Sequence, residues 1–414
     1  MSRRIFSVIG KNFGDEGKGL ATNLLASSFC SSEKEGALTN TSSAYGNASI
    51  LGIRHNGGAQ SGHTVCHNGH RVVWHELSSA TPAGADTFWA DTYYPDLYKL
   101  ADEIQLAQQL CARPIKVRAD AETHITLIDD ILINMALEQS RGLGRHGSCG
   151  MGIYEATLRD AAGFALSLRD IASMSGESLY ATLCRIRNEY SFARLRDLSL
   201  TPDKMDSYND LIHDNNVLAN FSETILKNLK FVNIVDNLPA FAANYQNIIF
   251  EGGQGLLLDA DCERFSPHVT ASKTGLCNVC HVANRANLTE PIEAFYVTRS
   301  YVTRHGAGPL PCECERTKIG PITNDETNVT NPWQGSIRYA PHESLEEFVN
   351  PVKRDLESCK HEVRATLLVT HLNETDGCVV LHDQRIAIDE FKKLPVIADT
   401  FGKVLCSYSE TDMQ

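Results

Sequence analysis

Long apolar runs are absent from this sequence. No stretch reaches the roughly 18 to 20 apolar residues that span a bilayer, and the run at residues 5–9 is too short for a signal peptide. Positive charge is also scarce, since 51 acidic residues outnumber 38 basic ones and give a formal net charge of −13. Nucleic acid and anionic membranes attract basic surfaces. We therefore expect a cytoplasmic globular protein that binds neither and that holds anionic ligands with local loops and a few placed cations.

The 13 cysteines do not form the even, regularly spaced set of a secreted disulfide scaffold. We expect reduced thiols and no structural disulfide. One alternative comes from two close pairs, Cys277 with Cys280 and Cys312 with Cys314, because four thiolates can bind Zn²⁺ tetrahedrally. The Cys-x-Cys spacing of the second pair is tighter than in common zinc sites, which makes zinc the weaker hypothesis.

Short apolar segments alternate with segments of helical periodicity. Strand-like runs lie at residues 5–9, 247–250, 294–301 and 365–370, and helical spacing occurs at residues 20–26, 96–111 and 222–229. This alternation favours an α/β fold with helices covering a central, mostly parallel sheet. We expect one domain over residues 1–414, with a mainly helical subdomain around 150–245. A stretch rich in Ser, Thr, Asn and Gly predicts an irregular insertion around residues 27–47.

The first apolar run leads into a Gly-rich stretch at residues 10–19. Glycines allow backbone N–H groups to approach phosphate oxygens, a helix start adds positive potential, and Lys18 can neutralise phosphate charge. The stretch is not a Walker A loop, because no glycine stands five residues before Gly17 and Gly19 occupies the Ser/Thr position. It predicts a phosphate-binding loop of another kind, and the alternative is a tight turn with solvated charges.

Five motifs in order along the chain resemble those of adenylosuccinate synthetases. They are Gly-Asp-Glu-Gly-Lys-Gly at residues 14–19, Gly-Gly-x-x-x-Gly-His-Thr at 57–64, a glycine block at 251–255 continuing to 269–272, Thr-Arg-His-Gly-Ala-Gly-Pro at 303–309, and Thr-His-Leu-Asn at 370–373. Together they span nearly the whole chain. The set is therefore much more specific than one Gly-rich loop.

The resemblance implies a ligase that joins L-aspartate to C6 of IMP. Asp15 would remove the N1 proton of the base, so that O6 attacks the γ-phosphate of the donor. His63 would stabilise the transferring phosphoryl group together with Lys18, and Gln254 would contact the base or its O6. Asp15 and the carbonyl of Gly62 would hold Mg²⁺, and the amine of aspartate would finally displace phosphate from C6.

The resemblance also implies a set of binding residues. Those for nucleotide and phosphate are Gly14, Glu16, Gly17, Gly19, Ser148, Cys149, Arg159, Thr270, Arg304 and Asn373, and those for aspartate are Ser336 and Arg338. Ser148 keeps the hydroxyl of a family phosphate loop, whereas Cys149 departs from it. In the family, a residue near position 159 reaches across a dimer to the substrate phosphate of the partner subunit. Arg159 lies one residue from that position, so an ordinary solvated arginine is an equal alternative.

Two departures from the family pattern bear on substrate choice. Asn373 stands where the family usually has the Asp that reads guanine, and its amide suits the edge of adenine. We therefore expect ATP or dATP to serve as donor beside GTP. The aspartate loop, residues 331–338, retains only Arg338 of the usual arginines, and Arg338 can still bind a carboxylate through two parallel hydrogen bonds.

Several alternatives stay open. The phage branch of the family makes 2-aminoadenylosuccinate from dGMP, and it usually lacks the Asp found here as Asp15, so IMP is the first choice of acceptor and dGMP the second. A non-catalytic nucleotide-binding paralogue and a phosphotransferase without a ligase step are further alternatives, and the presence of Asp15, Lys18, His63 and Gln254 favours the ligase. The family resemblance also implies a homodimer.

Overall fold

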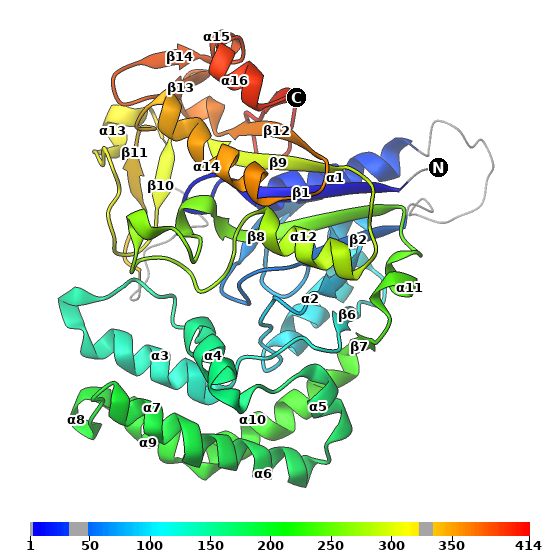
Figure 1. Ribbon diagram of the computed structural model, residues 1–414, viewed down its shortest axis with the longest axis vertical. Helices are drawn as coiled ribbons and strands as arrows, with labels where there is room; N and C mark the ends of the chain where they lie inside the picture. The colour runs from blue at the N-terminus through cyan, green and yellow to red at the C-terminus, as the bar shows by residue number, and fades with distance from the viewer. Residues whose placement is uncertain (1–2, 33–48, 323–333) are drawn as a thin grey trace.

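A nine-stranded parallel sheet forms the centre of the molecule (Figure 1). The computed structural model describes residues 3–32, 49–322 and 334–414. The strand order is β15-β12-β9-β1-β8-β2-β5-β6-β7, and neighbouring strands run parallel. The bounds are β1 Arg4–Gly10, β2 Ile50–Arg54, β5 Asp86–Trp89, β6 Val117–Asp120, β7 Val232–Val235, β8 Asn247–Gly255, β9 Ile292–Arg299, β12 Val363–Thr370 and β15 Lys403–Cys406. The parallel α/β sheet expected from the sequence is confirmed.

Short strand pairs and helices complete the described chain. Three antiparallel pairs join β3 His63–His67 to β4 His70–Trp74, β10 Val302–Arg304 to β11 Arg338–Ala340, and β13 Cys378–Val380 to β14 Arg385–Ala387. The helices are α1 Lys18–Ser32, α2 Leu100–Cys111, α3 Ile128–Ser140, α4 Ile153–Arg159, α5 Leu168–Ser173, α6 Gly176–Ile186, α7 Phe192–Asp197, α8 Pro202–Met205, α9 Ser207–His213, α10 Asn215–Asn228, α11 Leu238–Ala242, α12 Leu276–Arg285, α13 Arg316–Ile319, α14 Leu345–Ser358, α15 Ile388–Phe391 and α16 Pro395–Thr400.

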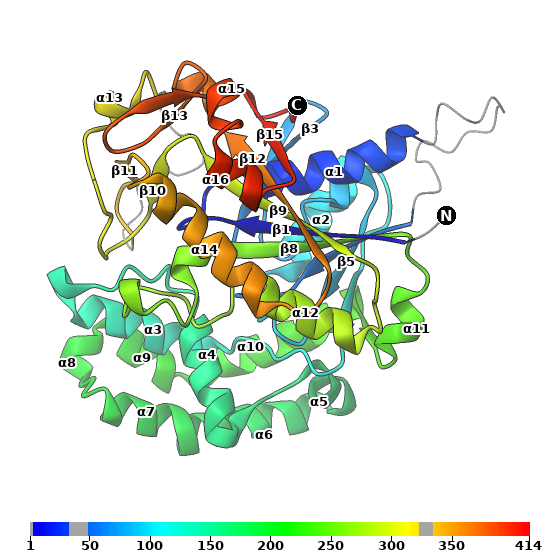
Figure 2. The same ribbon diagram turned by 45° about the horizontal axis from the view of Figure 1, so that its top comes forward.

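Strand β1 shows how the sequence builds the two faces of the sheet. Successive side chains of a strand point to opposite faces. Ile5 and Ile9 therefore lie in one core with the apolar sides of α12 and α14, while Phe6 and Val8 lie in another core with α1. Figure 2 shows α12 and α14 on one side of the sheet and α1 on the other. Burial on both faces explains why β1 reads as a continuous apolar run.

Helices α3 to α10 form a layer on one side of the sheet, seen at the bottom of Figures 1 and 2. Leu132, Ile133 and Ala136 of α3 pack there against Leu195 and neighbouring residues. The helical part expected around residues 150–245 thus begins earlier, at α3. The same range also contains β7, which lies at the edge of the central sheet. That these parts form one domain remains a prediction.

Two expectations need correction. Helix α1 continues to Ser32, so residues 27–32 are helical and not part of an irregular insertion, and residues 33–47 lie outside the described chain. The expectation of no disulfide is wrong, because Cys280 of α12 is joined to Cys359, which follows α14.

The disulfide also removes Cys280 from the four-thiolate zinc hypothesis. Across residues 3–32, 49–322 and 334–414, no group of three or more His, Cys, Asp or Glu side chains could hold a metal ion. Within the same ranges, no helix combines the length and the apolar character needed to cross a membrane.

Candidate active site

Three Gly-rich loops meet at the carboxyl ends of β1, β2 and β8, in the middle of the sheet. A Cβ atom added to Gly10 would lie 2.5 Å from the carbonyl oxygen of Gln254, and one added to Gly255 would lie 2.3 Å from that of Asn12. These two glycines therefore allow the loops after β1 and β8 to pack backbone against backbone. The carboxyl ends of strands are where open parallel sheets bind ligands.

The buried carboxylate of Glu16 fixes the Gly-rich loop that follows β1. Its Oε1 accepts hydrogen bonds from the backbone N–H groups of Asn12 and Gly14, both at 2.9 Å, and its Oε2 lies 3.1 Å from Nζ of Lys18. The side chain is 2% exposed. Phosphate binding therefore does not fit the carboxylate of Glu16, which accepts from the loop N–H groups and forms an ion pair with the buried Lys18.

Asp15 lies on the open side of the same loop. Its φ of +60° is in the left-handed region, and Nε of Arg299 fixes the strained backbone by donating to the carbonyl of Asp15 at 2.7 Å. The side chain remains 32% exposed, with Nε2 of His305 at 3.8 Å from Oδ2. A carboxylate held in this way is accessible to a ligand, as a general base must be.

His63 is held by a buried network. Its Nδ1 lies 2.5 Å from Oε1 of Glu251, and Glu251 also accepts from the hydroxyl of Ser78 at 2.7 Å and from Ser79. Nη1 of Arg54 lies 3.5 Å from the same Glu251 oxygen. The start of α1 is adjacent, since a Cβ atom on Gly19 would lie 3.2 Å from Cβ of His63. The network thus brings the imidazole beside Lys18 and Gly19.

The charges of this network are defined at neutral pH. Burial and the nearby Arg54 lower the pKa of His63 to about 4, so the imidazole is neutral. Burial alone would raise the pKa of Glu251, but the hydrogen bond from His63 and the charge of Arg54 outweigh it and lower that pKa to about 2. Nδ1 lies 2.5 Å from the Glu251 carboxylate and 3.0 Å from Nη1 of Arg54, so its role as donor or acceptor depends on the tautomer. Nε2 has no hydrogen-bond partner among the described residues, and it is an acceptor in the tautomer in which Nδ1 donates to Glu251.

Acidification from pH 6.5 toward pH 4 is expected to destabilise the protein. Burial, followed by the charge of Arg54, lowers the pKa of fully buried His55 to about 3, so folded His55 stays neutral while the unfolded histidine takes up a proton. Such a histidine lowers the free energy of unfolding by up to about 1.4 kcal/mol per pH unit in this range. Replacing it by His55→Phe keeps a ring edge-on to Phe250 and removes this contribution. Urea unfolding at several pH values measures the slope, and an identical slope in the variant would contradict the argument.

Gln254 has the left-handed φ of +48° and places its carboxamide above Gly57. Its Oε1 is buried without a hydrogen-bond partner among the described residues. Asn56 fixes the neighbouring backbone, because its amide exchanges two hydrogen bonds with Gly253, of 2.8 and 3.1 Å. A fixed backbone with an unpaired amide oxygen suits contact with a polar ligand.

The loop at residues 147–152 lies against the loop after β10. Its backbone N–H groups at Gly147 and Ser148 donate to Oε2 of buried Glu138, at 3.0 and 3.2 Å, and the Ser148 hydroxyl donates to Asn134. Burial raises the pKa of the Cys149 thiol. Ser148 and Cys149 therefore stay candidates for ligand contact, on a loop that Glu138 anchors.

Arg159 does not fit the phosphate-binding role expected for it. Its side chain is completely buried. Nε donates to Asp130, Nη1 donates to Asp160 and to the carbonyl of Phe164, and Nη2 donates to the carbonyl of Ile125. The guanidinium joins α3 to α4 and is not offered to a ligand.

Arg304 also lies within the wall of the site. Its guanidinium donates to the carbonyls of Pro309 and His268, at 2.8 and 2.7 Å, and stacks 4.5 Å from the ring centre of Phe13. Burial and the charge of Arg338 lower its pKa to about 10. Because the side chain is only 2% exposed, the expected contact with a nucleotide phosphate does not fit Arg304, which instead supports the loop after β10.

Arg338, unlike Arg304, is partly exposed. It lies opposite Arg304 in the β10–β11 pair, and its Nη1 is 2.8 Å from a carboxylate oxygen of Glu313. A guanidinium that already holds one half-exposed carboxylate can exchange it for that of a substrate. Ser336 is exposed nearby, while residues 331–333 of the expected aspartate loop lie outside the described chain.

The remaining predicted residues lie in the segments that follow β8 and β12. Thr270 is half-buried, and its N–H donates to the carbonyl of Leu258 at 2.8 Å. Asn373 is exposed, in a turn after β12. The Thr370 hydroxyl, at the end of that strand, donates to the carbonyl of Glu16 at 2.8 Å and so joins the turn to the Gly-rich loop.

The donor set fits Mg²⁺ better than a metal held by protein alone. The ligands expected are a carboxylate oxygen of Asp15 and the carbonyl oxygen of Gly62, which are hard ligands of the kind that Mg²⁺ prefers. The described residues hold no larger metal-binding group. Mg²⁺ commonly uses one or two protein ligands together with substrate phosphates. The residues present therefore fit a metal that arrives with a nucleotide.

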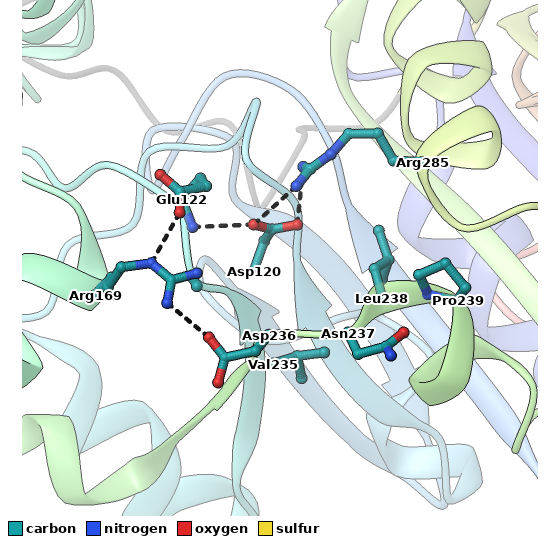
Figure 3. Close-up of a pocket in the computed structure, with 10 residues that line it drawn as sticks. Asp120, Glu122, Arg169, Val235, Asp236, Asn237, Leu238, Pro239 and Arg285 are labelled. Carbon is teal, nitrogen blue, oxygen red and sulfur yellow. Dashed lines mark hydrogen bonds and ion pairs between the residues drawn. The ribbon is translucent and has the colours of Figure 1, made fainter.

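The molecule also has a hollow away from these loops, of about 340 Å³, at the ends of β6 and β7 (Figure 3). Arg169 there bridges Glu122 and Asp236, at 2.9 Å each, and Arg285 lies 2.8 Å from Asp120. Because both guanidinium groups are already paired, we do not place the active site there.

Comparison with known proteins identifies the family of this chain. The family model for adenylosuccinate synthetase matches residues 40–332. Adenylosuccinate synthetases from Thioalkalivibrio sulfidiphilus and a Synechococcus species are 26% and 28% identical over 74% of this chain. The aligned part spans 64% and 63% of the length of these two relatives, respectively.

Two solved structures have a similar fold. The fully ligated adenylosuccinate synthetase of Plasmodium falciparum superposes with a TM-score of 0.67 at 17% identity and covers 99% of each chain. The cyanophage S-2L succinoaminodeoxyadenylate synthetase bound to dGMP and dATP superposes with a TM-score of 0.63 at 13% identity, and covers 100% of this chain and 95% of the phage chain.

Sequence reasoning missed three supporting residues. Arg54 lies just before one of the recognised motifs and Glu251 begins another, but their partnership with His63 depends on β2 and β8 being neighbours in the sheet. His305 also lies inside a recognised motif. Its approach to Asp15 depends on a contact between loops that are 290 residues apart.

Proposed function

We propose that this chain, which belongs to the adenylosuccinate synthetase family, joins L-aspartate to C6 of IMP with hydrolysis of a purine nucleoside triphosphate. One observation supports the proposal above all. An accessible Asp15, a buried Lys18 and the His63–Glu251 pair lie together at the carboxyl ends of the central strands. A phosphotransferase with a Walker A loop needs neither His63 nor Glu251.

Asp15 is the general base in this proposal. Its carboxylate accepts the N1 proton of the base, and the electron pair that is released makes O6 nucleophilic toward the γ-phosphate. Gln254 contacts the base edge with its carboxamide. Mg²⁺, when bound with the nucleotide at Asp15 and Gly62, supplies charge neutralisation for the phosphate oxygens.

His63 and Lys18 stabilise the transferring phosphoryl group. When Nδ1 of His63 donates to Glu251, Nε2 is an acceptor, so a hydrogen bond to phosphate requires the imidazole to take up a proton. Phosphate charge favours that uptake, and the Glu251 carboxylate at 2.5 Å stabilises the imidazolium that results. Glu251 is thus a positioning residue for His63.

The aspartate side of the site uses Arg338 and Ser336. An incoming carboxylate of aspartate replaces Glu313 on the guanidinium of Arg338. The amine of aspartate then attacks C6, and the phosphorylated O6 leaves as inorganic phosphate. From the family resemblance we also propose a homodimer that works in the cytoplasm.

A second candidate is the formation of 2-aminoadenylosuccinate from dGMP, with ATP or dATP as donor. Asn373 favours an adenine donor, because an amide offers both an acceptor and a donor to the N1 and N6 edge. The phage structure of similar fold contains dGMP and dATP. Retention of Asp15 still places IMP first.

A matrix assay tests both candidates. L-Aspartate and Mg²⁺ are supplied with IMP or dGMP as acceptor and with GTP, ATP or dATP as donor, and the succino-product is measured by mass. We expect product from IMP, with ATP used within about a hundredfold of GTP. The Asn373→Asp variant is the matched control and is expected to shift the preference toward GTP. Product from dGMP alone would support the second candidate, and no product from any pair would overturn the ligase proposal.

A further inference from the structure

His305 directly follows β10 and turns its ring toward the loop after β1. Nε2 lies 3.8 Å from Oδ2 of Asp15, and the ring is 14% exposed. Nδ1 is buried and has no hydrogen-bond partner among the described residues. Asp15 is thus the acceptor toward which the other ring nitrogen points.

The loop that carries His305 is fixed independently of the ring. Nη2 of Arg338 donates to the carbonyls of Gly306 and Gly308, at 2.9 and 2.8 Å. The N–H of Gly306 donates to the carbonyl of Gln334 at 3.2 Å. These bonds hold the backbone next to His305 in place without any contact of the imidazole itself.

Asp15 is fixed through its backbone and free at its side chain. Arg299 holds the carbonyl of Asp15, while the carboxylate has a third of its surface exposed. A general base is effective only if one oxygen faces the proton that it removes. The Asp15 carboxylate therefore needs a neighbouring group that selects one rotamer. Among the described residues, His305 lies close enough to do so.

We propose that His305 is a positioning residue for Asp15. The N–H at Nε2 donates a hydrogen bond to Oδ2, which leaves Oδ1 for the N1–H of the purine and the second lone pair of Oδ2 for the expected Mg²⁺. Closing the present distance to a hydrogen bond requires a movement of roughly 1 Å, and such bonds often tighten only when substrate binds. Both the neutral Nε2–H form and the charged form of the ring can donate, so the role does not depend on titration. This inference depends on the proposed function, in which Asp15 is the base.

Two substitutions separate this role from simple filling of space. In His305→Gln the side-chain amide nitrogen can occupy the position of Nε2, whereas in His305→Asn it reaches only that of Nδ1. We expect kcat to fall roughly 10- to 100-fold in His305→Asn, with little change in KM for the acceptor, and to stay within about threefold in His305→Gln. Equal activities of the two variants would overturn the proposal.

A double variant tests whether His305 acts through Asp15. When Asp15→Asn has already removed the base, adding His305→Asn is expected to lower kcat by less than about twofold. A full additional loss would assign His305 a role of its own. Thermal unfolding of all variants controls for folding.

An independent readout does not need turnover. The ¹⁵N chemical shift of Nε2 in His305 reports its hydrogen bond, and it is expected to move when Asp15→Asn is introduced but not with exposed Asp399→Asn. An unmoved shift would overturn the His305 proposal even in an active enzyme. A moved shift in a protein that makes no succino-product would instead overturn the proposed function and leave the Asp15–His305 bond standing.

Discussion

The Asp15→Asn variant is expected to lose about 10²- to 10⁴-fold in kcat for aspartate-dependent formation of the succino-product, the range expected when a general base is removed. Asparagine keeps the size of the side chain, and it tolerates the left-handed φ of +60° found at this position. It cannot accept the N1 proton at neutral pH. Without that transfer O6 stays a weak nucleophile toward phosphate.

The same variant separates chemistry from folding. Arg299 binds the backbone carbonyl of residue 15, so that contact survives the substitution. We expect unchanged thermal unfolding and retained binding of the acceptor nucleotide. Single-turnover kinetics with IMP and L-aspartate measure the chemical step, and more than about a third of the wild-type rate would exclude Asp15 as the base.

The Glu251→Gln variant is expected to lose about 3 to 5 kcal/mol in the free energy of unfolding, as expected when one partner of a buried ion pair is removed. Arg54, which is 1% exposed, would lose the carboxylate that lies 3.5 Å from its guanidinium. Ser78 and Ser79 would also donate their hydrogen bonds to a neutral amide in place of a charged carboxylate.

Urea unfolding at pH 7 measures this loss. Exposed Glu223→Gln on α10 is the matched control and should change the free energy of unfolding by less than about 0.5 kcal/mol. The pKa of Glu251 is depressed in the folded state, so its contribution is complete above the ordinary carboxylate pKa and disappears as the pH falls toward 2. A variant as stable as the wild type at pH 7 would mean that the network does not hold His63 in place.

The parts of the fold that could be predicted are those with strong local signals. The apolar run of β1, the glycines after it and the start of α1 appear in the sequence because both faces of β1 are buried. Short strands such as β6, with the sequence Val-Arg-Ala-Asp, were not predicted, since four residues with two charges carry little periodicity.

In the candidate site too, residues within motifs could be predicted, whereas contacts between distant segments could not. The motifs predicted Asp15, Lys18, His63 and Gln254 as site residues. The structure places Asp15 on the loop after β1, Lys18 at the start of α1, His63 at the start of β3 and Gln254 near the end of β8. The sequence left the role of Arg159 open between ligand binding and an ordinary arginine, because a buried arginine and a ligand-binding arginine look alike in a sequence. Its main partner, Asp130, lies 29 residues away on another helix. The disulfide escaped prediction for a similar reason, since 79 residues separate Cys280 from Cys359.

The fate of the C6 oxygen tests the central claim most directly. IMP labelled with ¹⁸O at C6 is converted with L-aspartate, Mg²⁺ and the preferred donor, and the inorganic phosphate is examined by mass spectrometry. If O6 attacks the γ-phosphate and the amine of aspartate then displaces it, every phosphate formed carries one ¹⁸O and the succino-product carries no label at C6. Phosphate without ¹⁸O, or phosphate released at the same rate without aspartate, would contradict the proposed reaction.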